Sequence, residues 1–357
     1  MSTFRERWRT RGPVAFAISL SLVALYVVLY FRGEWIRPIA VAMGLRSEWL
    51  LYGALYSIAM AGGAVYYLRR HGNSRYNRVR IAVNLAVQVI LAFSLPLVMP
   101  WLGGREAYLS YFWPLSWYDL HPGTLRSMPL WLALYAVVGA LVAAPVLAIF
   151  FGKRWYCSWV CGCGGLANTF GDPFRHLTST STRSWRFEKW SVHIVLALAV
   201  VSTALLFVDE LGHGGGTFHA LVASERWWSL KKLYGLVVGA ILAGVVGTGL
   251  YPLLGPRVWC RNFCPMAALL GFFHRVGNRF RVRVKPDMCI SCGNCTTYCE
   301  MGIDVRSYAQ SNQSFTRASC VGCGMCAHVC PRGVLRVEST SPAQKDKART
   351  RLPIADF

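Results

Sequence analysis

The sequence predicts an α-helical polytopic membrane protein that ends in a small α+β domain. The composition is that of a membrane protein, because hydrophobic residues make up 54% of the chain, charged residues only 15%, and the mean hydropathy is +0.37. Six apolar stretches are long enough to cross a bilayer, and eight cysteines gather in two short runs near the C-terminus. The apolar stretches predict the membrane domain, and the cysteine runs predict the small domain.

Each apolar stretch has about the 20 residues that a helix needs to cross a hydrocarbon layer of about 30 Å. None of the 38 Lys and Arg or the 16 Asp and Glu falls inside one of them. Because a charge at the bilayer centre costs at least about 2.5 kcal/mol, this exclusion supports six transmembrane helices. We expect them at residues 13–31, 49–68, 81–100, 130–151, 190–208 and 233–254.

The distribution of basic residues predicts that both ends of the chain face the cytoplasm. With the N-terminus inside, the inward segments carry 30 Lys and Arg and the outward segments carry 8. This asymmetry follows the positive-inside rule. Topology therefore explains the net charge of +22, and we expect no nucleic acid as a partner. We expect a multi-pass protein of a bacterial cytoplasmic (inner) membrane, in contact with the lipid bilayer.

The two cysteine runs, 289–299 and 320–330, both have the spacing C-x2-C-x2-C-x3-C. This spacing places three thiolates on one [4Fe–4S] cluster and sends the fourth to a second cluster, as in bacterial two-cluster ferredoxins. Structural zinc is the alternative for C-x2-C pairs, but four evenly spaced cysteines suit a cluster better. We expect the first cluster to bind Cys289, Cys292, Cys295 and Cys330, and the second to bind Cys320, Cys323, Cys326 and Cys299.

The ferredoxin-like domain is expected over residues 286–338, on the cytoplasmic side. The six-helix membrane domain precedes it over residues 1–275, and a polar tail follows over residues 339–357. A basic connector, residues 276–285, lies between the two domains. Its side chains are expected to contact anionic lipid headgroups, at about 1 kcal/mol per charge.

The membrane domain contains an internal repeat at the ends of its fourth and sixth apolar stretches. Residues 151–166 align without gaps on residues 254–269, and each copy contains a C-x3-C pair. In a helix the positions i and i+4 share one face. The two pairs are therefore expected to form one metal or iron–sulfur site at the inner membrane surface, with Cys157, Cys161, Cys260 and Cys264 as ligands. Cys163 is a further candidate ligand, and buried inert thiols are the alternative.

The helices, the twin C-x3-C motifs and the C-terminal cysteine runs together resemble the NapH/NosR/CcoG-type polyferredoxin membrane proteins, over about residues 129–338. The resemblance implies a quinol-linked electron carrier of nitrate or nitrous oxide respiration, or a metal-reducing assembly factor for oxidases. The C-x3-C-P motifs are functional in that family. The first motif departs from this pattern with Gly162 in place of proline. Six spans also exceed the four expected of the nitrate-reductase member, so the resemblance does not indicate which respiratory pathway this protein serves.

We expect an iron–sulfur protein that passes electrons between the quinone pool and a redox partner protein, as a quinol dehydrogenase or oxidoreductase subunit. Quinol oxidation releases protons, so a base must lie within hydrogen-bond reach of the quinol hydroxyls. His193 inside the fifth stretch is one candidate, with a hydrogen-bonded core histidine as its alternative. The candidates on the outward side, which are equally consistent with a solvated loop, are Asp119, His121, Asp209, Glu210, His213 and His219.

A second hypothesis belongs to another class of function. Thiolates select Cu(I) or iron–sulfur clusters, so the same cysteines suit a copper or iron reductase, or an assembly factor for a respiratory oxidoreductase. The sequence leaves this alternative open.

Overall fold

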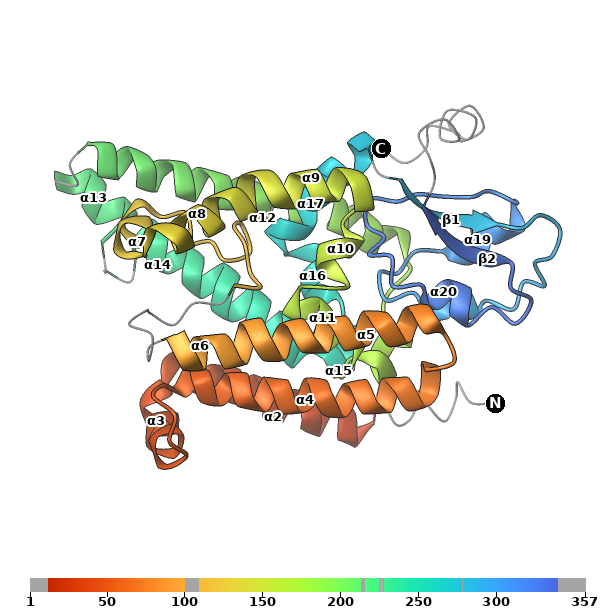
Figure 1. Ribbon diagram of the computed structural model, residues 1–357, viewed down its shortest axis with the longest axis horizontal. Helices are drawn as coiled ribbons and strands as arrows, with labels where there is room; N and C mark the ends of the chain where they lie inside the picture. The colour runs from red at the N-terminus through yellow and green to blue at the C-terminus, as the bar shows by residue number, and fades with distance from the viewer. Residues whose placement is uncertain are drawn as a thin grey trace.

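A computed structural model describes residues 12–99, 109–212, 216–224, 226, 228–277 and 279–339, which form a helical bundle with the cysteine-rich domain at one end (Figure 1). Six helices among these residues are long and apolar enough to cross a membrane, as the apolar stretches predict. They are Pro13–Phe31, Glu48–His71, Arg75–Val98, Leu130–Phe151, Thr182–Leu211 and Leu230–Gly249.

The third and fifth of these helices begin well before the predicted stretches, at Arg75 rather than residue 81 and at Thr182 rather than residue 190. The third begins at Arg75, where the Ser74 side chain caps it, and basic residues up to Arg80 extend it toward the cysteine-rich domain. The fifth begins at Thr182, and Ser181 caps it in the same way. Charge exclusion marks the apolar part of a helix, whereas capping residues mark its first turn.

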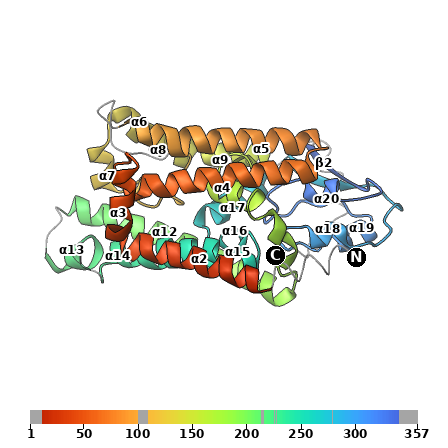
Figure 2. The same cartoon turned by 90° about the horizontal axis from the view of Figure 1, so that it is seen from below.

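In Figure 1 the first three long helices lie along one side of the bundle; seen from below in Figure 2, the first of them lies apart from the second and third. Three π-helical stretches of the described residues, η1 (Gln88–Ser94), η3 (Gly139–Ala143) and η5 (Gly235–Gly249), lie within the long helices. The glycine-rich η5 packs against the first long helix, Pro13–Phe31. The elements of this side are α2 (Pro13–Phe31), α3 (Gly33–Ala42), α4 (Glu48–His71), α5 (Arg75–Val87), η1 (Gln88–Ser94) and α6 (Leu95–Val98).

The fourth and fifth long helices lie along the opposite side (Figure 1). The sixth, formed by α14 and η5, runs between the two sides and contacts α2. The elements of this part are α7 (Pro122–Ser127), α8 (Leu130–Val138), η3 (Gly139–Ala143), α9 (Ala144–Phe151), α12 (Thr182–Leu211), α13 (Gly216–Val222), α14 (Leu230–Tyr234) and η5 (Gly235–Gly249).

Short helices that carry the internal repeat fold back between the two sides of the bundle (Figure 1). Gly152 follows α9 with a φ of 68°, and Gly255 follows α15 with a φ of 94°. Glycine adopts such positive φ values without steric cost, so the chain reverses at the same position of both copies. The elements are α10 (Arg154–Cys157), α11 (Gly162–Asn168), η4 (Asp172–Leu177), α15 (Tyr251–Leu254), α16 (Val258–Asn262) and α17 (Pro265–Gly277).

The cysteine-rich domain contains a two-stranded antiparallel sheet in which Phe280 pairs with Ser339 and Val284 with Leu335. Its first strand lies within the expected basic connector, so this segment is part of the domain rather than a linker. The alternation FRVRV buries Phe280, Val282 and Val284 on one face. The elements are β1 (Phe280–Val284), α18 (Asn294–Thr297), α19 (Val305–Gln310), α20 (Met325–His328) and β2 (Leu335–Ser339). The expected tail beyond residue 339 lies outside the described residues.

Candidate iron–sulfur sites

Two cavities of the cysteine-rich domain are lined by four cysteines each. The first is otherwise lined mainly by apolar side chains such as Ile290 and Leu335, and its cysteines are Cys289, Cys292, Cys295 and Cys330. The second lies against β1, and its cysteines are Cys299, Cys320, Cys323 and Cys326. Each cavity thus takes three cysteines from one run and one from the other.

These cavities have the chemistry that a [4Fe–4S] cluster requires. All thirteen cysteines are free thiols, and four soft thiolate ligands select iron–sulfur clusters among metal groups. The backbone N–H of Val334 donates to the Cys330 sulfur at 3.4 Å, a kind of contact that tunes cluster potential. The apolar walls limit the access of water to the group.

The two cavities differ in their distance from solvent. Cys292 of the first cavity is exposed, whereas Cys299 of the second is half-buried. Burial raises the pKa of the Cys299 thiol to about 12, with the neighbouring Cys323 adding to the shift. Metal ligation must therefore displace the proton of this thiol. The first cavity therefore lies nearer the protein surface.

The repeat cysteines lie in one buried core, but no single helix carries either pair. Cys157 ends α10 and Cys161 precedes α11, so the expected i, i+4 helical arrangement is replaced by a turn. The two copies close this turn in the same way. The N–H of Cys161 donates to the Tyr156 carbonyl at 2.7 Å, and the N–H of Cys264 donates to the Trp259 carbonyl at 2.9 Å.

The repeat cysteines also lie close to one another. Each of the four is 5% exposed, and Cys264 interacts electrostatically with the other three. No three His, Cys, Asp or Glu side chains of the described residues are placed to hold a single metal ion.

The first copy lies near the middle of the bundle, which differs from the expected position at the inner membrane surface. The Tyr56 hydroxyl donates to the carbonyl of Gly162 at 2.9 Å, and the Gln88 amide donates to the carbonyl of Val160. Tyr56 and Gln88 lie near the middle of the candidate spans Glu48–His71 and Arg75–Val98. The chain reversal after α9 carries α10 and α11 to this depth.

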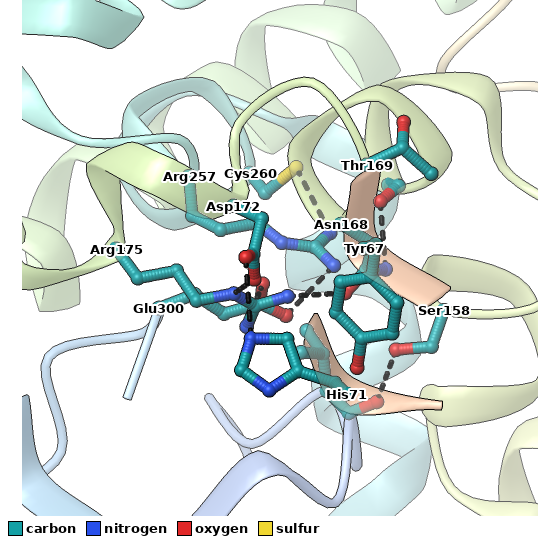
Figure 3. A network of polar contacts seen from close by, with 12 residues as sticks. Tyr67, His71, Ser158, Asn168, Thr169, Asp172, Arg175, Arg257, Cys260 and Glu300 are labelled. Atoms are coloured by element: carbon teal, nitrogen blue, oxygen red, sulfur yellow. Dashed lines mark hydrogen bonds and ion pairs between the residues drawn. The ribbon is translucent and has the colours of Figure 1, made fainter. Parts of the chain in front are cut away.

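A buried polar network joins the repeat to the cysteine-rich domain (Figure 3). Glu300, which follows Cys299, pairs with Arg257 at 2.9 Å and with Arg175 at 2.8 Å. Burial raises the pKa of Glu300, but Arg175 and Arg257 outweigh this effect and bring the pKa below its ordinary value. Arg257 also donates to the Cys157 carbonyl at 3.2 Å. The Glu300 carboxylate, next to the second cavity, thus contacts Arg257 of the second copy, and Arg257 in turn contacts Cys157 of the first copy.

The arginines that the repeat alignment pairs both contact the cysteine-rich domain. Arg257 reaches Glu300, and Arg154 lies over the Phe280 ring at 4.8 Å. Two further hydrogen bonds hold the domains together, because Tyr76 donates to the Gly322 carbonyl at 2.7 Å and Ser158 to that of Val321 at 2.6 Å. The cysteine-rich domain is therefore docked rigidly on the bundle through the repeat.

The structure does not gather the expected acid and base candidates into one site. His193 is exposed on α12. Asp209 pairs with His219 at 2.7 Å, and Glu210 pairs with Arg126 instead. His213 lies outside the described residues.

Asp119 and His121 lie on the segment before α7. The His121 ring is 6% exposed and packs against Trp117, with ring centroids 4.6 Å apart. Burial lowers the pKa of His121 to about 4, and Lys231 adds to the shift. Burial raises the pKa of Asp119 to about 7.

Sequence reasoning missed a polar stripe on α5 and η1. Asn77, Arg80, Asn84 and Gln88 are spaced by three or four residues, and each is at most 1% exposed. They therefore share one helix face, which is turned into the protein. The sequence does contain a signal for this stripe, because uncharged polar residues recur at helical spacing inside an apolar stretch. The exclusion of charged residues, which defines the spans, does not detect it.

Comparisons with known proteins match the same two regions. The family described as "4Fe-4S dicluster domain" matches residues 282–337. The family described as "4Fe-4S binding domain" matches residues 128–180 and again residues 237–283, and each match contains one copy of the repeat. Both copies thus lie in regions similar to iron–sulfur proteins.

Two curated proteins are similar over about half of this chain. "Putative electron transport protein YccM" of Escherichia coli (strain K12) is 24% identical over 216 residues, which cover 58% of this chain and 57% of that protein. "Methylamine utilization ferredoxin-type protein MauN" of Methylobacillus flagellatus is 28% identical over 173 residues, which cover 47% of this chain and 55% of that protein. The chain thus spans just over half the length of these relatives. No solved structure gives a significant match.

Proposed function

We propose that this chain is an iron–sulfur electron-transfer protein of the polyferredoxin type, which passes electrons between the quinone pool and a redox partner through two [4Fe–4S] clusters. Its similarity to 4Fe-4S families and to proteins named for electron transport supports this proposal. The observation that carries the proposal is the row of cysteines from the middle of the bundle to the protein surface. Cys161 marks its inner end, Cys299 lies at the domain junction, and the exposed Cys292 marks its outer end.

The two cysteine quartets would hold the two clusters, and the repeat cysteines would hold a further metal or iron–sulfur group. When bound, each [4Fe–4S] cluster takes up or gives up one electron. A hydroquinone that is oxidised loses two electrons and two protons, so its electron pair matches the two clusters. The chain's own groups must hold and move the protons. Arg257 and Glu300 position the second quartet against the repeat.

The protein would lie in a bacterial inner membrane with the cysteine-rich domain in the cytoplasm. The greater number of Lys and Arg on that side supports this orientation. An even number of candidate spans places both ends of a chain on the same side of a membrane. The start of α2 and the cysteine-rich domain accordingly lie at the same end of the bundle (Figure 1). Reporter fusions at either end of the chain test this orientation.

Reoxidation of the purified protein tests the function. We expect about eight or more iron atoms per chain and signals of reduced clusters in electron paramagnetic resonance after treatment with dithionite. A quinone analogue added in nanodiscs should then reoxidise the clusters. Failure of every quinone analogue, together with copper bound by the repeat cysteines, would instead favour the metal-reducing function.

A further inference from the structure

Three polar side chains converge on Gly162, next to Cys161. A Cβ atom built on Gly162 would lie 2.3 Å from the Tyr111 hydroxyl, 2.6 Å from Oε1 of Gln88 and 2.7 Å from the Tyr56 hydroxyl. We call Tyr56, Gln88 and Tyr111 the Gly162 cluster. They come from α4, from η1 and from the segment that precedes α7. A proline could not be accommodated among these atoms, which explains the glycine at this position.

The Gly162 cluster keeps unused hydrogen-bonding capacity. The Tyr56 hydroxyl has one hydrogen for two acceptors, the Gly162 carbonyl at 2.9 Å and Oε1 of Gln88 at 3.4 Å. Among the described residues, none accepts a hydrogen bond from the Tyr111 hydroxyl. A buried polar group without a partner costs about 1–3 kcal/mol. Tyr56 and Tyr111 are half-buried, so part of each side chain stays accessible to a ligand.

The polar stripe of α5 leads to this cluster. Asn84 lies one turn before Gln88, is 1% exposed, and its Oδ1 has no hydrogen-bond partner among the described residues. Arg80 lies one turn further back and donates to the Tyr67 hydroxyl at 3.0 Å, at the edge of the network in Figure 3. Polar side chains inside spanning helices are costly, and they mark substrate or proton pathways.

The second copy of the repeat differs at the position of Gly162. Its equivalent of Gly162 is Pro265, and the next residues, Met266 and Ala267, are 0% and 5% exposed in the apolar core. The second copy has a proline at the position of Gly162, so its turn is closed by a ring where the first copy leaves its backbone open to polar side chains. The convergence of Tyr56, Gln88 and Tyr111 on this residue therefore uses the glycine that the second copy lacks.

We propose that the Gly162 cluster binds one oxygen of a quinone headgroup. The hydroxyls of Tyr56 and Tyr111 donate to this oxygen when it is a carbonyl, and Oε1 of Gln88 accepts from it when it is a hydroxyl. The inference rests on the proposed quinone function and names the site of that function. It places the headgroup beside Cys161 at the middle of the bundle, rather than at His193 or at the outward carboxylates.

Quinone kinetics of two variants test this site in the full-length protein with its clusters. The rate at which decylubiquinone reoxidises dithionite-reduced clusters gives an apparent KM. Tyr111→Phe removes one hydrogen bond, worth about 0.5–1.5 kcal/mol, and should raise this KM about 3- to 10-fold. Gly162→Ala should raise it further, because the added methyl group would displace the Tyr56 and Tyr111 hydroxyls and Oε1 of Gln88 from their positions. Tyr66→Phe, on the exposed face of α4, should leave the KM unchanged.

The rate of cluster reoxidation by ferricyanide distinguishes the loss of the quinone site from general damage to the protein. Both variants should keep the wild-type iron content and the wild-type rate of reoxidation by this water-soluble acceptor. An unchanged quinone KM in Tyr111→Phe would overturn the site while the quinone function stands. If decylubiquinone fails to reoxidise even the wild-type clusters, the proposed function itself is overturned.

Discussion

The Glu300 carboxylate lies 2.9 Å from the Arg257 guanidinium, and both side chains are 0% exposed. Glu300 directly follows Cys299, at a position where the bacterial ferredoxin pattern has proline. Arg257 belongs to the second copy of the repeat and also donates to the Cys260 sulfur at 3.6 Å. A single ion pair therefore links the second cysteine quartet to the repeat cysteines.

Glu300→Gln should strongly destabilise the docking of the two domains. The substitution leaves the Arg257 and Arg175 charges buried without their partner, and removal of one partner from a buried ion pair costs about 3–5 kcal/mol. We expect a lower midpoint of thermal unfolding and an altered electron paramagnetic resonance signal of the second cluster. Thermal denaturation of the reconstituted protein, followed by spectroscopy of the reduced sample, checks both effects.

Glu338→Gln provides the matched control. Glu338 pairs with Arg281 at 3.6 Å and with Arg283 at 3.5 Å, but its side chain is 28% exposed. Exposed pairs contribute at most about 1 kcal/mol, so the midpoint should move little. Equal losses in the two variants would show that Glu300 has no special role at the junction.

Alanine substitutions of two glycines distinguish the cost of backbone strain from the cost of a steric clash at the domain junction. Gly322 and Gly333 have φ values of 62° and 58°, but only a Cβ on Gly322 would meet the bundle, 2.8 Å from Cβ of Arg154. Gly333→Ala should cost about 1–2 kcal/mol for its left-handed backbone. Gly322→Ala should cost clearly more, because it also pushes the two domains apart. Similar unfolding midpoints for the two variants would contradict the close docking.

Asp119 should make the stability of the protein depend on pH. Burial raises its pKa from 3.8 to about 7, so the native state binds this proton more tightly than the unfolded chain does. The stabilisation is complete below the unfolded pKa and is lost as the pH rises through about 7. We expect the unfolding midpoint to fall over this range, and Asp119→Asn to remove part of the slope. Asp287→Asn, on an exposed turn, should leave the slope unchanged.

The six helices and the composition of the cysteine cavities follow from local patterns. Apolar length and the absence of charge place the spans, and the C-x2-C-x2-C-x3-C spacing indicates which cysteines belong together. The alternation FRVRV was also readable, but its arginines favoured a lipid-facing connector over a strand. Their partner Glu338 lies more than fifty residues further along the chain, so the strand depends on a distant pairing.

The path of the first repeat copy could not be predicted. Its depth depends on the reversal at Gly152 and on hydrogen bonds from Tyr56 and Gln88, which lie in other helices. In the sequence, Glu300 is a small departure from the ferredoxin pattern, and Gly162 is a departure from the C-x3-C-P motif. In the fold, both departures are explained by side chains that arrive from distant segments.

Electron transfer in a variant of the repeat tests the central claim most directly. Cys157→Ser/Cys260→Ser removes one thiolate from each copy and leaves both ferredoxin quartets intact. We predict that both clusters still assemble and are still reoxidised by ferricyanide, while their reoxidation by decylubiquinone falls to the background rate. Wild-type quinone activity in this variant would contradict an electron path through the repeat.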